Sequence, residues 1–422
     1  MRRVPSLLIA PLLVVGFLAC VGDDPVAVGS GPADDAATPT GDSASTTDGA
    51  STVDGSSPGD SGSDATSPPG CGYPGESCCV APLAPCQAGS TCSTGTSKCL
   101  VSDAWVVGGY TVFSNAGGIA DRTVTAHYDG VSWTRGPDVP TDWRPVALFQ
   151  SAPSTVRIVS SHNNDLGGKY FYLSGATFKE CGVGQPCIAP LLSGGKLVEL
   201  TAVTAIDNEF WLAGTNQIYR CASGAGSCVS VTAGMTGTWA YGNFAGTTAT
   251  DFWFSGLDRA FHYNGTAWTV HPSLKARTIH QVRKDDVWVG DTTLQHWNGS
   301  AWSSEYNIDG NPAPGLIVSI SGSGASDLWA AGNQNNAASF AAHWDGTKWS
   351  LSALPVTATW INAIWAPSRL EAFAVGDKTG IFKWDGTKWL AMPSPQLPVV
   401  AGETIVSELR WVSVHGLARP RP

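Results

Sequence analysis

Hydrophobic and polar residues alternate over short stretches from about residue 101 to residue 422, as expected for β-strands with one buried face. One stretch, such as Ile317-Val-Ser-Ile320, is followed by a second that begins Asp327-Leu-Trp329. A third stretch, such as Ala341-Ala-His-Trp344, precedes a turn and a fourth stretch that begins near Trp349. The pattern therefore predicts units of four consecutive antiparallel strands.

A two-part phrase marks these units along the chain. The first part is Asp-x-Trp-x-x-Gly, and the second is an aromatic residue followed by Asp/Asn-Gly-x-x-Trp. The first part occurs as Asp103 to Gly108, Asp251 to Gly256 and Asp327 to Gly332, with looser copies at Glu209, Asp286 and Glu371; the second begins at Tyr128, Tyr263, Trp297, Trp344 and Trp384. Tryptophans 211, 253, 288 and 329 lie 42, 35 and 41 residues apart, a period typical of propeller blades.

Asp-Gly and Asn-Gly are strong signals for two-residue type I′ hairpins. If Asp345-Gly346 forms such a turn, Trp344 pairs with Thr347 and Ala342 with Trp349. The two tryptophans then lie on one face as diagonal neighbours, available for packing between blades.

Counting the phrases predicts an all-β, seven-bladed β-propeller. Six units start near residues 103, 209, 251, 286, 327 and 371, and the interval 135 to 208 is long enough for a degenerate seventh. The chain ends with a spare strand near 408 to 415, which would close the ring against the first unit. Six blades would result if the interval were an insertion, and eight is the other alternative.

The Asp-Gly-x-x-Trp phrase resembles the Asp-box (BNR-like) repeat of sialidases, sortilin-type receptors and other bacterial propellers. Here Asp and Gly are adjacent, and His or Lys stands two positions before Asp. The resemblance implies a structural turn for Asp129, Asp345 and Asp385, on the face away from the ligand. His127, His262, His296 and His343 recur once per blade, so we interpret them as cross-strand packing rather than as a shared metal site.

The N-terminus has the composition of an export signal, with Arg2 and Arg3 before an apolar run that is too short to span a bilayer. The segment Phe17-Leu18-Ala19-Cys20 resembles a bacterial lipoprotein signal, which implies cleavage after residue 19 and acylation of Cys20. An ordinary cleaved signal is the alternative. The prediction is an exported, lipid-anchored protein of the outer membrane or cell surface, which contacts the membrane through this anchor.

Residues 20 to 70 are predicted to form a disordered, acidic linker of Gly, Ser, Thr, Asp, Ala and Pro. Nine Asp and no Glu, Lys or Arg occur between residues 21 and 70, so most of the net charge of −10 arises there. Residues 71 to 422 carry 22 basic and 25 acidic groups. This near balance argues against nucleic acid as a partner.

Cysteine spacing predicts a small disulfide module over residues 71 to 100. Six cysteines lie there, with no His and no Cys-x-x-Cys pair, so disulfides are favoured over zinc in an exported chain. The string from Cys71 to Cys79 resembles small knottin-like modules, and the pairing is left open. The six cysteines are Cys71, Cys78, Cys79, Cys86, Cys92 and Cys99. Cys181 with Cys187 and Cys221 with Cys228 are two further predicted local pairs.

Catalytic signatures are missing from the chain. Neither Gly-x-Ser-x-Gly nor His-Glu-x-x-His occurs, and there is no Arg-Ile-Pro phrase of the kind that a sialidase carries. No catalytic residue, metal or cofactor is predicted, although Asp- and Asn-rich loops could hold Ca²⁺. An enzyme is therefore the less favoured interpretation.

Enlarged, amide-rich loops between strands are the predicted ligand-binding sites, because such loops open opposite the Asp-Gly hairpins in a propeller. The alternative is that Asn, Ser and Gly simply form good loops. The candidate residues are Asn115, His162, Asn163, Asn164, Asp165, Tyr306, Asn307, Asp309, Asn333 and Asn335.

Taken together, the sequence predicts a surface-anchored, non-catalytic binding scaffold of the cell envelope for a glycan or protein ligand. It resembles exported bacterial propeller lipoproteins with Trp- and Asp-Gly-rich repeats. A glycan-cleaving hydrolase or lyase is one alternative, supported by analogy of fold alone. An assembly factor for an envelope complex is the other.

Overall fold

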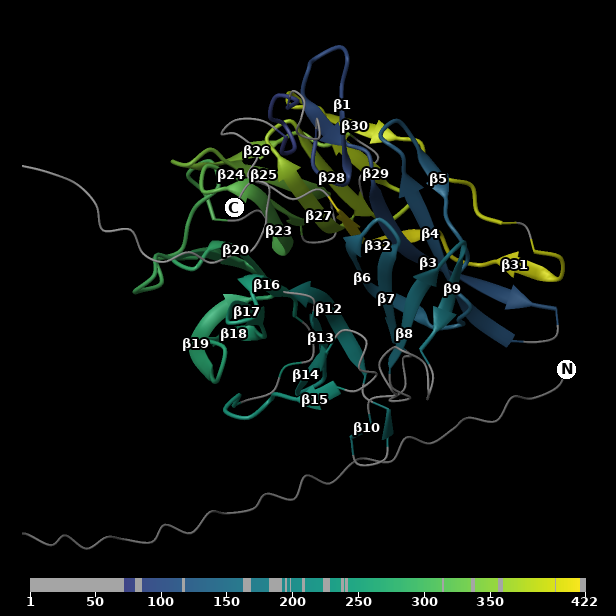
Figure 1. Ribbon diagram of the computed structural model, residues 1–422, viewed down its shortest axis with the longest axis horizontal. Helices are drawn as coiled ribbons and strands as arrows, with labels where there is room; N and C mark the ends of the chain where they lie inside the picture. Colours follow the sequence, from purple (N-terminus) through teal and green to yellow (C-terminus); the bar gives the residue numbers. More distant parts are fainter. Residues whose placement is uncertain are drawn as a thin grey trace, which may run out of the picture. The chain divides into compact units, whose positions relative to one another are not determined.

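The computed structural model shows an all-β chain whose sheets are arranged as the seven blades of a propeller (Figure 1). It describes residues 72–417 except 80–85, 116–117, 162–167, 182–191, 194–195, 198, 207–208, 223–227, 237–238, 240–241, 313–314, 335–337, 356–359 and 399. The predicted signal, Cys20 and the linker lie outside these residues. Within the described ranges, no helix has the length and apolarity needed to span a bilayer.

Blade 1 is built from both ends of the propeller sequence. Its strands are β32 (Arg410–Gly416), β3 (Ala104–Ser114), β4 (Gly118–Tyr128) and β5 (Trp133–Arg135), and β31 (Glu403–Ile405) pairs with the distal end of β3. Trp105 lies opposite His415, so the C-terminal strand hydrogen-bonds to the first propeller strand. This pairing closes the ring and removes two free sheet edges.

Blades 2 to 4 are four-stranded antiparallel sheets. Blade 2 contains β6 (Arg144–Ala152), β7 (Thr155–Ser161), β8 (Gly168–Ser174) and β9 (Thr177–Glu180); blade 3 contains β12 (Leu200–Ile206), β13 (Glu209–Gly214), β14 (Gln217–Ala222) and β15 (Cys228–Ser230); blade 4 contains β16 (Phe244–Thr248), β17 (Asp251–Ser255), β18 (Leu257–Tyr263) and β19 (Trp268–Ala276). Between blades 2 and 3 lies a small hairpin of β10 (Leu192–Ser193) and β11 (Lys196–Leu197). Blade 2 is the degenerate unit expected between residues 135 and 208.

Blades 5 to 7 complete the ring. Blade 5 contains β20 (Thr278–Arg283), β21 (Asp286–Gly290) and β22 (Leu294–Trp297); blade 6 contains β23 (Leu316–Gly324), β24 (Asp327–Asn333), β25 (Ser339–Trp344) and β26 (Trp349–Ser352); blade 7 contains β27 (Ile361–Ser368), β28 (Glu371–Gly376), β29 (Ile381–Trp384) and β30 (Trp389–Met392). In blade 5, single bridges from Trp297 to Trp302 and from Leu294 to Tyr306 replace a regular fourth strand. The predicted count of seven blades is confirmed.

Indole rings fill the space between neighbouring blades. The second-strand tryptophans Trp211, Trp253, Trp288 and Trp329 are each at most 2% exposed. Trp329 of blade 6 packs against Trp384 and Trp389 of blade 7, with ring centroids 4.9 and 5.0 Å apart. Such aromatic pairs add about 0.5–1.5 kcal/mol each beyond burial of their area. The repeated tryptophans are therefore part of the core that holds the blades together.

The predicted register of the Asp-Gly hairpins is wrong. Trp344 pairs directly with Trp349, and the loop between them has four residues instead of two. The Asp345 carboxylate accepts hydrogen bonds from the amides of Thr347 and Lys348, at 2.8 and 2.9 Å, and only Gly346 has a positive φ, of 99°. The carboxylate thus stabilises a wider turn than type I′. The two tryptophans do share one face, as a direct pair rather than as diagonal neighbours.

Candidate functional site

The face that carries the Asp-Gly hairpins, here called the Asp-Gly face, contains a repeated polar contact. Each predicted packing histidine is bonded through Nε2 to the Asp that lies two residues before the second-strand Trp of its own blade. The Nε2 to Oδ1 distances are 3.0 Å for His127–Asp103, 2.6 Å for His262–Asp251, 2.9 Å for His296–Asp286 and 2.7 Å for His343–Asp327. The same imidazoles lie on the Trp of the Asp-x-Trp phrase, with centroids 4.4 to 4.7 Å apart in the four blades.

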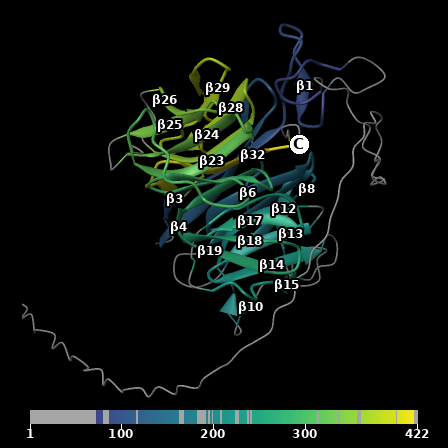
Figure 2. The same ribbon diagram turned by 90° about the vertical axis from the view of Figure 1, so that its left-hand side faces the viewer.

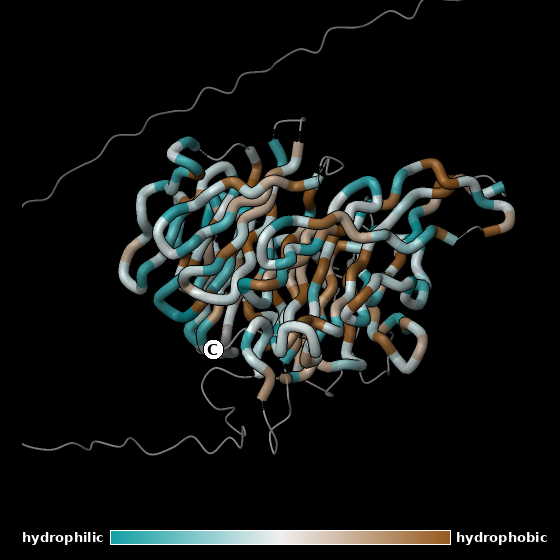
Figure 3. The backbone as a smooth tube through the Cα atoms, turned by 90° about the horizontal axis from the view of Figure 1, so that it is seen from above, coloured by the Kyte–Doolittle hydropathy of each residue, from teal (hydrophilic) through white to brown (hydrophobic). Residues whose placement is uncertain are grey.

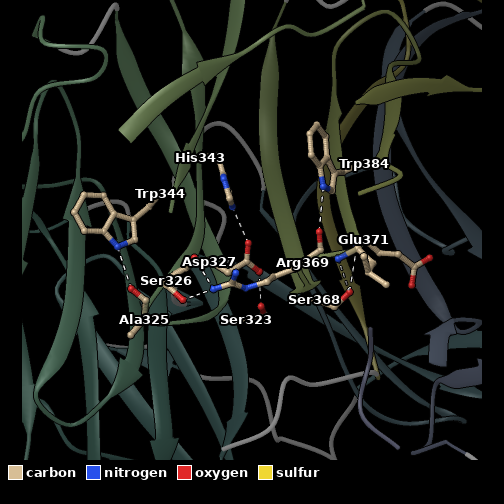
Figure 4. A network of polar contacts seen from close by, with 11 residues as sticks. Ser323, Ala325, Ser326, Asp327, His343, Trp344, Ser368, Arg369, Glu371 and Trp384 are labelled. Carbon is tan, nitrogen blue, oxygen red and sulfur yellow. Dashed lines mark hydrogen bonds and ion pairs between the residues drawn. The ribbon is translucent and has the colours of Figure 1, made fainter. Parts of the chain in front are cut away.

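Blades 6 and 7 are also joined across this face (Figure 4). Arg369 of blade 7 donates through Nη2 to the carbonyl oxygen of Ser326 in blade 6, at 3.0 Å. Trp344 donates its indole N–H to the carbonyl of Ala325, and Trp384 donates to the carbonyl of Arg369. The polar groups of the repeat therefore bond to each other and to the backbone, which supports the structural role expected for the phrase.

The disulfide module contacts the Asp-Gly face at the junction of blades 7 and 1. Its strands are β1 (Ser90–Cys92) and β2 (Cys99–Val101), and Figures 1 and 2 place β1 beside blade 7. The amide of Val101 donates to Glu371 Oε2 at 2.6 Å, and Glu371 Oε1 lies 2.7 Å from Lys383 Nζ. Glu371 and Lys383 occupy the positions that Asp and His have in other blades. Because Glu371 has a longer side chain than the Asp of the other blades, its carboxylate reaches the module.

The described cysteines form disulfides, in agreement with the sequence. Cys78 is bonded to Cys92, Cys86 to Cys99, and Cys221 to Cys228 as predicted. Cys79 and Cys181 are also disulfide-bonded, whereas Cys71 and Cys187 lie outside the described residues. The sulfur atoms of Cys78, Cys86 and Cys99 lie within 4.8 Å of one another, because two disulfides are adjacent in the module.

The opposite face, here called the loop face, carries a groove of about 460 Å³ at the junction of blades 7 and 1. Its lining residues are Lys378, Thr379, Leu397, Ile405, Val406, Ser407, Glu408 and Leu409. One wall is the turn between β28 and β29, and the other is the segment that precedes β32. The groove therefore lies on the face where propeller loops were expected to bind a ligand.

The turn in the first wall is strained. Lys378 and Thr379 have φ values of 53° and 62°, in the left-handed region that favours glycine. Gly380 donates its amide to the carbonyl of Asp377 at 3.0 Å, which closes a tight two-residue hairpin turn. The amide of Thr379 donates to the carbonyl of Leu409 in the facing wall, also at 3.0 Å. This contact joins the two walls at one end of the groove.

The second wall belongs to a projection that we call the arm. The arm is formed by the described residues of 109–122 and 400–407, and it extends the sheet of blade 1. β3 and β4 have 11 residues each, and β31 pairs with β3 so that Ile405 lies opposite Val112. Tyr110 and Val112 are buried on one face of the arm, in a cluster with Leu409 and the partly buried Leu397. Figure 3 shows the arm extending from one side of the ring, with hydrophobic residues along it.

Apolar exposure is concentrated on this arm. Five of the ten exposed large hydrophobic side chains described for the protein belong to it. They are Phe113 (46% exposed), Ile119 (75%), Val400 (45%), Ile405 (45%) and Val406 (55%). Ile405 pairs with Val112, whereas Phe113 pairs with Ile119, so the exposed side chains are divided between the two faces of the arm.

Charged groups around the groove are mostly paired within the chain. Arg410 Nε lies 2.9 Å from Asp377 Oδ1, which also accepts a hydrogen bond from Asn362 Nδ2 at 3.0 Å. On the arm, Arg122 is ion-paired with Glu403, and this bond raises the pKa of the guanidinium. Lys378 and Glu408 are exposed and have no ion-pair partner among the described residues. Among the described residues that line the groove, one cation and one anion are thus without an ion-pair partner.

The predicted ligand-binding residues that the structure describes do not converge. His162, Asn163, Asn164, Asp165 and Asn335 lie outside the described residues. Asn115 lies on the arm, where its amide donates to the carbonyl of Gly402 at 2.8 Å. It is the one described candidate that lies on the arm, and it does not line the groove.

Tyr306, Asn307 and Asp309 lie on the outer side of blades 5 and 6. Tyr306 packs on Trp288 and Trp344, at 4.9 and 5.5 Å between centroids, and the Asp309 carboxylate accepts the amide of Leu351 at 2.8 Å. Asn307 is exposed between them. The segment therefore covers an outer strand edge instead of forming the open loop that was expected.

Asn333 is 3% exposed, and both polar atoms of its side chain form hydrogen bonds to the neighbouring blade. Its Nδ2 donates to the carbonyl of Ile361 at 3.0 Å, and its Oδ1 accepts the amide of Ile361 at 2.8 Å. Asn243 makes the same pair of bonds to Ile279, both at 2.9 Å. These asparagines join the strands of neighbouring blades, which is a physical reason for their presence other than ligand binding.

Sequence reasoning missed the groove and the arm. Asn115 was assigned to an enlarged loop, although Tyr110 and Val112 alternate with Thr111 and Phe113 just before it, as in a strand. Alternation in this stretch is the signal that could have revealed the long hairpin. No local signal connects it with residues 400–409, because those residues are almost three hundred positions further along the chain.

The fold and this site define the protein as a seven-bladed β-propeller with a groove on its loop face. Searches with the sequence against protein-family models and curated proteins found no match. Among solved structures, the chain is similar to YCF48 bound to D1 peptide (12% identity, 65% of this chain, 95% of that chain, TM-score 0.46). It is also similar to the RRP9 WD40 repeats (9% identity, 60% of this chain, 81% of that chain, TM-score 0.45). A further similar structure is YCF48 from Cyanidioschyzon merolae (11% identity, 65% of this chain, 97% of that chain, TM-score 0.43).

Proposed function

We propose that the protein is a non-catalytic binding scaffold that takes its ligand in the groove between Lys378-Thr379 and residues 405–409. The strained turn carries the proposal. Two consecutive non-glycine residues in the left-handed region cost about 1–3 kcal/mol each, and such strain is concentrated at binding and catalytic sites. A simple hairpin would form more readily with Asn-Gly.

The surroundings of the turn support a binding role. The groove is open on the loop face, and Ile405 and Val406 expose about half of their side chains there. Asp377, the carboxylate next to the turn, is bonded to Arg410 and Asn362. These bonds hold the turn in place and engage the carboxylate, which suits a rigid recognition surface.

Ligand screening with matched variants tests this function. The full chain is screened on a glycan array and against a random peptide library displayed on phage, beside Val406→Asp and Val229→Asp. Val229 is exposed to a similar extent, 60% against 55%, but lies on β15 of blade 3. We expect ligands that Val406→Asp loses at least tenfold and Val229→Asp retains. Ligands that bind both variants equally, or turnover of a glycan, would overturn the proposal.

We also propose that the chain is exported and anchored to the outer membrane or cell surface through acylated Cys20. The support is the sequence of residues 2 to 20, with its basic start, apolar run and Ala19-Cys20 ending. Mass spectrometry of the N-terminal peptide from expressing cells tests the anchor. Diacylglycerol and fatty acid on Cys20, lost in Cys20→Ser, is the expected result, and an unmodified N-terminus at another residue would contradict it.

A further inference from the structure

The edge of the arm beside the groove has the geometry of a strand that lacks one neighbour. β31 is the last strand of its sheet, in the order β31-β3-β4-β5. The amide of Asn115 bonds to the carbonyl of Gly402, and the amide of Val406 bonds to the carbonyl of Thr111. The amide of Ser407 also bonds to the carbonyl of Thr111, at 3.3 Å, and the amide of Glu403 bonds to the carbonyl of Val400, at 3.1 Å. Ile405 lies between these bonded residues. By the alternation of an extended strand, the N–H and C=O of Ile405 point away from β3.

The groove continues this open edge. At one end, Thr379 donates its amide to the carbonyl of Leu409, as a neighbouring strand would. Toward β31 the contact ends, and the space between the walls opens into the groove lined by Leu397, Ile405 and Val406. The free backbone of Ile405 and an aliphatic pocket thus lie side by side.

We infer that the ligand in this groove is an extended, aliphatic segment of a partner protein, which adds as a strand to β31 and places one side chain in the groove. This inference rests on the proposed function and names the class of its ligand. Strand addition uses backbone hydrogen bonds for affinity and alternate side chains for specificity, and the site offers both an edge and a pocket.

Charge favours this occupant over the other classes. Arg122 is paired with Glu403, and Arg410 with Asp377, so these groups contribute no net charge. Lys378 and Glu408 balance each other at the groove. A site whose net charge is zero is unsuited to phosphate, nucleic acid or an anionic lipid surface. It complements an uncharged segment instead.

The lining favours a peptide over a sugar. Among the residues that the structure describes, no aromatic side chain lines the groove, whereas Leu397, Ile405, Val406 and Leu409 do. An aliphatic wall gives a sugar ring no face on which to stack. It can bury a Val, Leu or Ile side chain, which contributes about 1.5–3 kcal/mol when burial is complete.

Peptides selected from the phage-displayed library on the full chain provide the probe. We expect aliphatic, uncharged sequences that Val406→Asp loses at least tenfold. The selected peptide is then synthesised with single N-methyl groups along its backbone. Strand addition predicts loss of binding at every second position, because alternate amides face β31. Uniform sensitivity, or none, would overturn the inference.

The edge itself is tested at Ile405. Ile405→Pro removes the outward N–H, and Ile405→Val keeps it with a similar side chain. We expect at least tenfold weaker peptide binding for Ile405→Pro and less than threefold change for Ile405→Val, with unchanged thermal unfolding in both. Equal binding by the two variants would contradict strand addition. Loss of folding in Ile405→Pro leaves the N-methyl pattern to decide.

Other ligand classes give distinguishable results. Glycans that require Val406 would keep the proposed function and overturn the peptide inference. The same holds for phosphatidylcholine vesicles that bind through Val406, and for a dimer in sedimentation that Ile405→Pro dissociates. If no glycan, peptide, vesicle or second copy depends on Val406, the proposed function itself fails.

Discussion

Glu371 and Lys383 form a nearly buried ion pair, with Oε1 and Nζ 2.7 Å apart and side-chain exposures of 2% and 17%. The second carboxylate oxygen of Glu371 accepts the amide of Val101, and Lys383 also donates to the hydroxyl of Tyr128 at 2.9 Å. The ion pair therefore joins blade 7 to blade 1 through Lys383 and to the disulfide module through Glu371. Burial opposes the charge on Lys383, but the contacts with Glu371 and Tyr128 together raise the pKa of the amine.

Lys383→Met should destabilise the protein strongly, because Glu371 is left as a buried charge without its cation. Breaking a buried pair from one side costs about 3–5 kcal/mol. The double variant Glu371→Gln with Lys383→Met should recover most of this loss. Urea unfolding followed by tryptophan fluorescence measures both. If the single and double variants lose the same stability, the pair does not act as a unit.

Acid stability should depend on the turn aspartates. The Thr347 hydroxyl, followed by the amides of Lys348 and Thr347, lowers the pKa of Asp345 to about 2. A carboxyl with a depressed folded pKa stabilises the fold above its unfolded pKa of about 3.9, and this contribution is lost as pH falls to the folded value. Asp345→Asn should therefore flatten the dependence of stability on pH between about 4 and 2.

A control for this prediction exists within the chain, since Asn264 and Asn298 occupy the same turn position. Asn264 Oδ1 accepts the amides of Thr266 and Ala267, as Asp345 accepts those of Thr347 and Lys348. The Asn variant should fold normally at pH 7. Adding Asp129→Asn and Asp385→Asn should enlarge the effect, because backbone and Thr387 hydrogen bonds also lower the pKa of these carboxyls. An unchanged acid transition in the triple variant would refute the assignment.

Replacing Lys378-Thr379 by Asn-Gly should stabilise the fold while weakening ligand binding. Gly adopts the left-handed region freely and Asn does so more readily than Lys, so we expect a gain of about 1–2 kcal/mol, or several degrees in Tm. Calorimetry measures the gain. Thr387→Gly is the control, because Thr387 lies in an exposed turn without a positive φ and should give no gain. A loss of stability in the Asn-Gly variant would show that the turn is not strained.

Asn333→Ala should destabilise the ring without affecting binding at the groove. It leaves both the N–H and the C=O of the buried Ile361 without their partner, at a cost of about 2–4 kcal/mol. Gln334→Ala, at the neighbouring and less buried position, should change stability by less than about 0.5 kcal/mol. Chemical unfolding of the two variants decides the matter. Similar stability for both would contradict the joining role of Asn333.

Local patterns were sufficient to predict the blades. Alternation predicts a strand at Trp329 and the Asp-Gly pair predicts a turn at Asp345-Gly346, and the structure has both. The turn length was predicted wrongly, because the Asp345 carboxylate bonds two amides and so competes with the backbone preference of Asp-Gly for type I′. The histidines were placed in packing, but their bonds to Asp were missed, because the partners lie on the neighbouring strand.

The sequence by itself determined the repeating strands, the seven blades and the disulfide chemistry, because each depends on the period of apolar residues or on residue types close together in the chain. Only the tertiary structure decided where a site could lie. The groove exists because ring closure brings residues 403–409 against β3 and the turn at Lys378, a juxtaposition of segments far apart in sequence. Such contacts follow from the packing of whole blades, which no local pattern records.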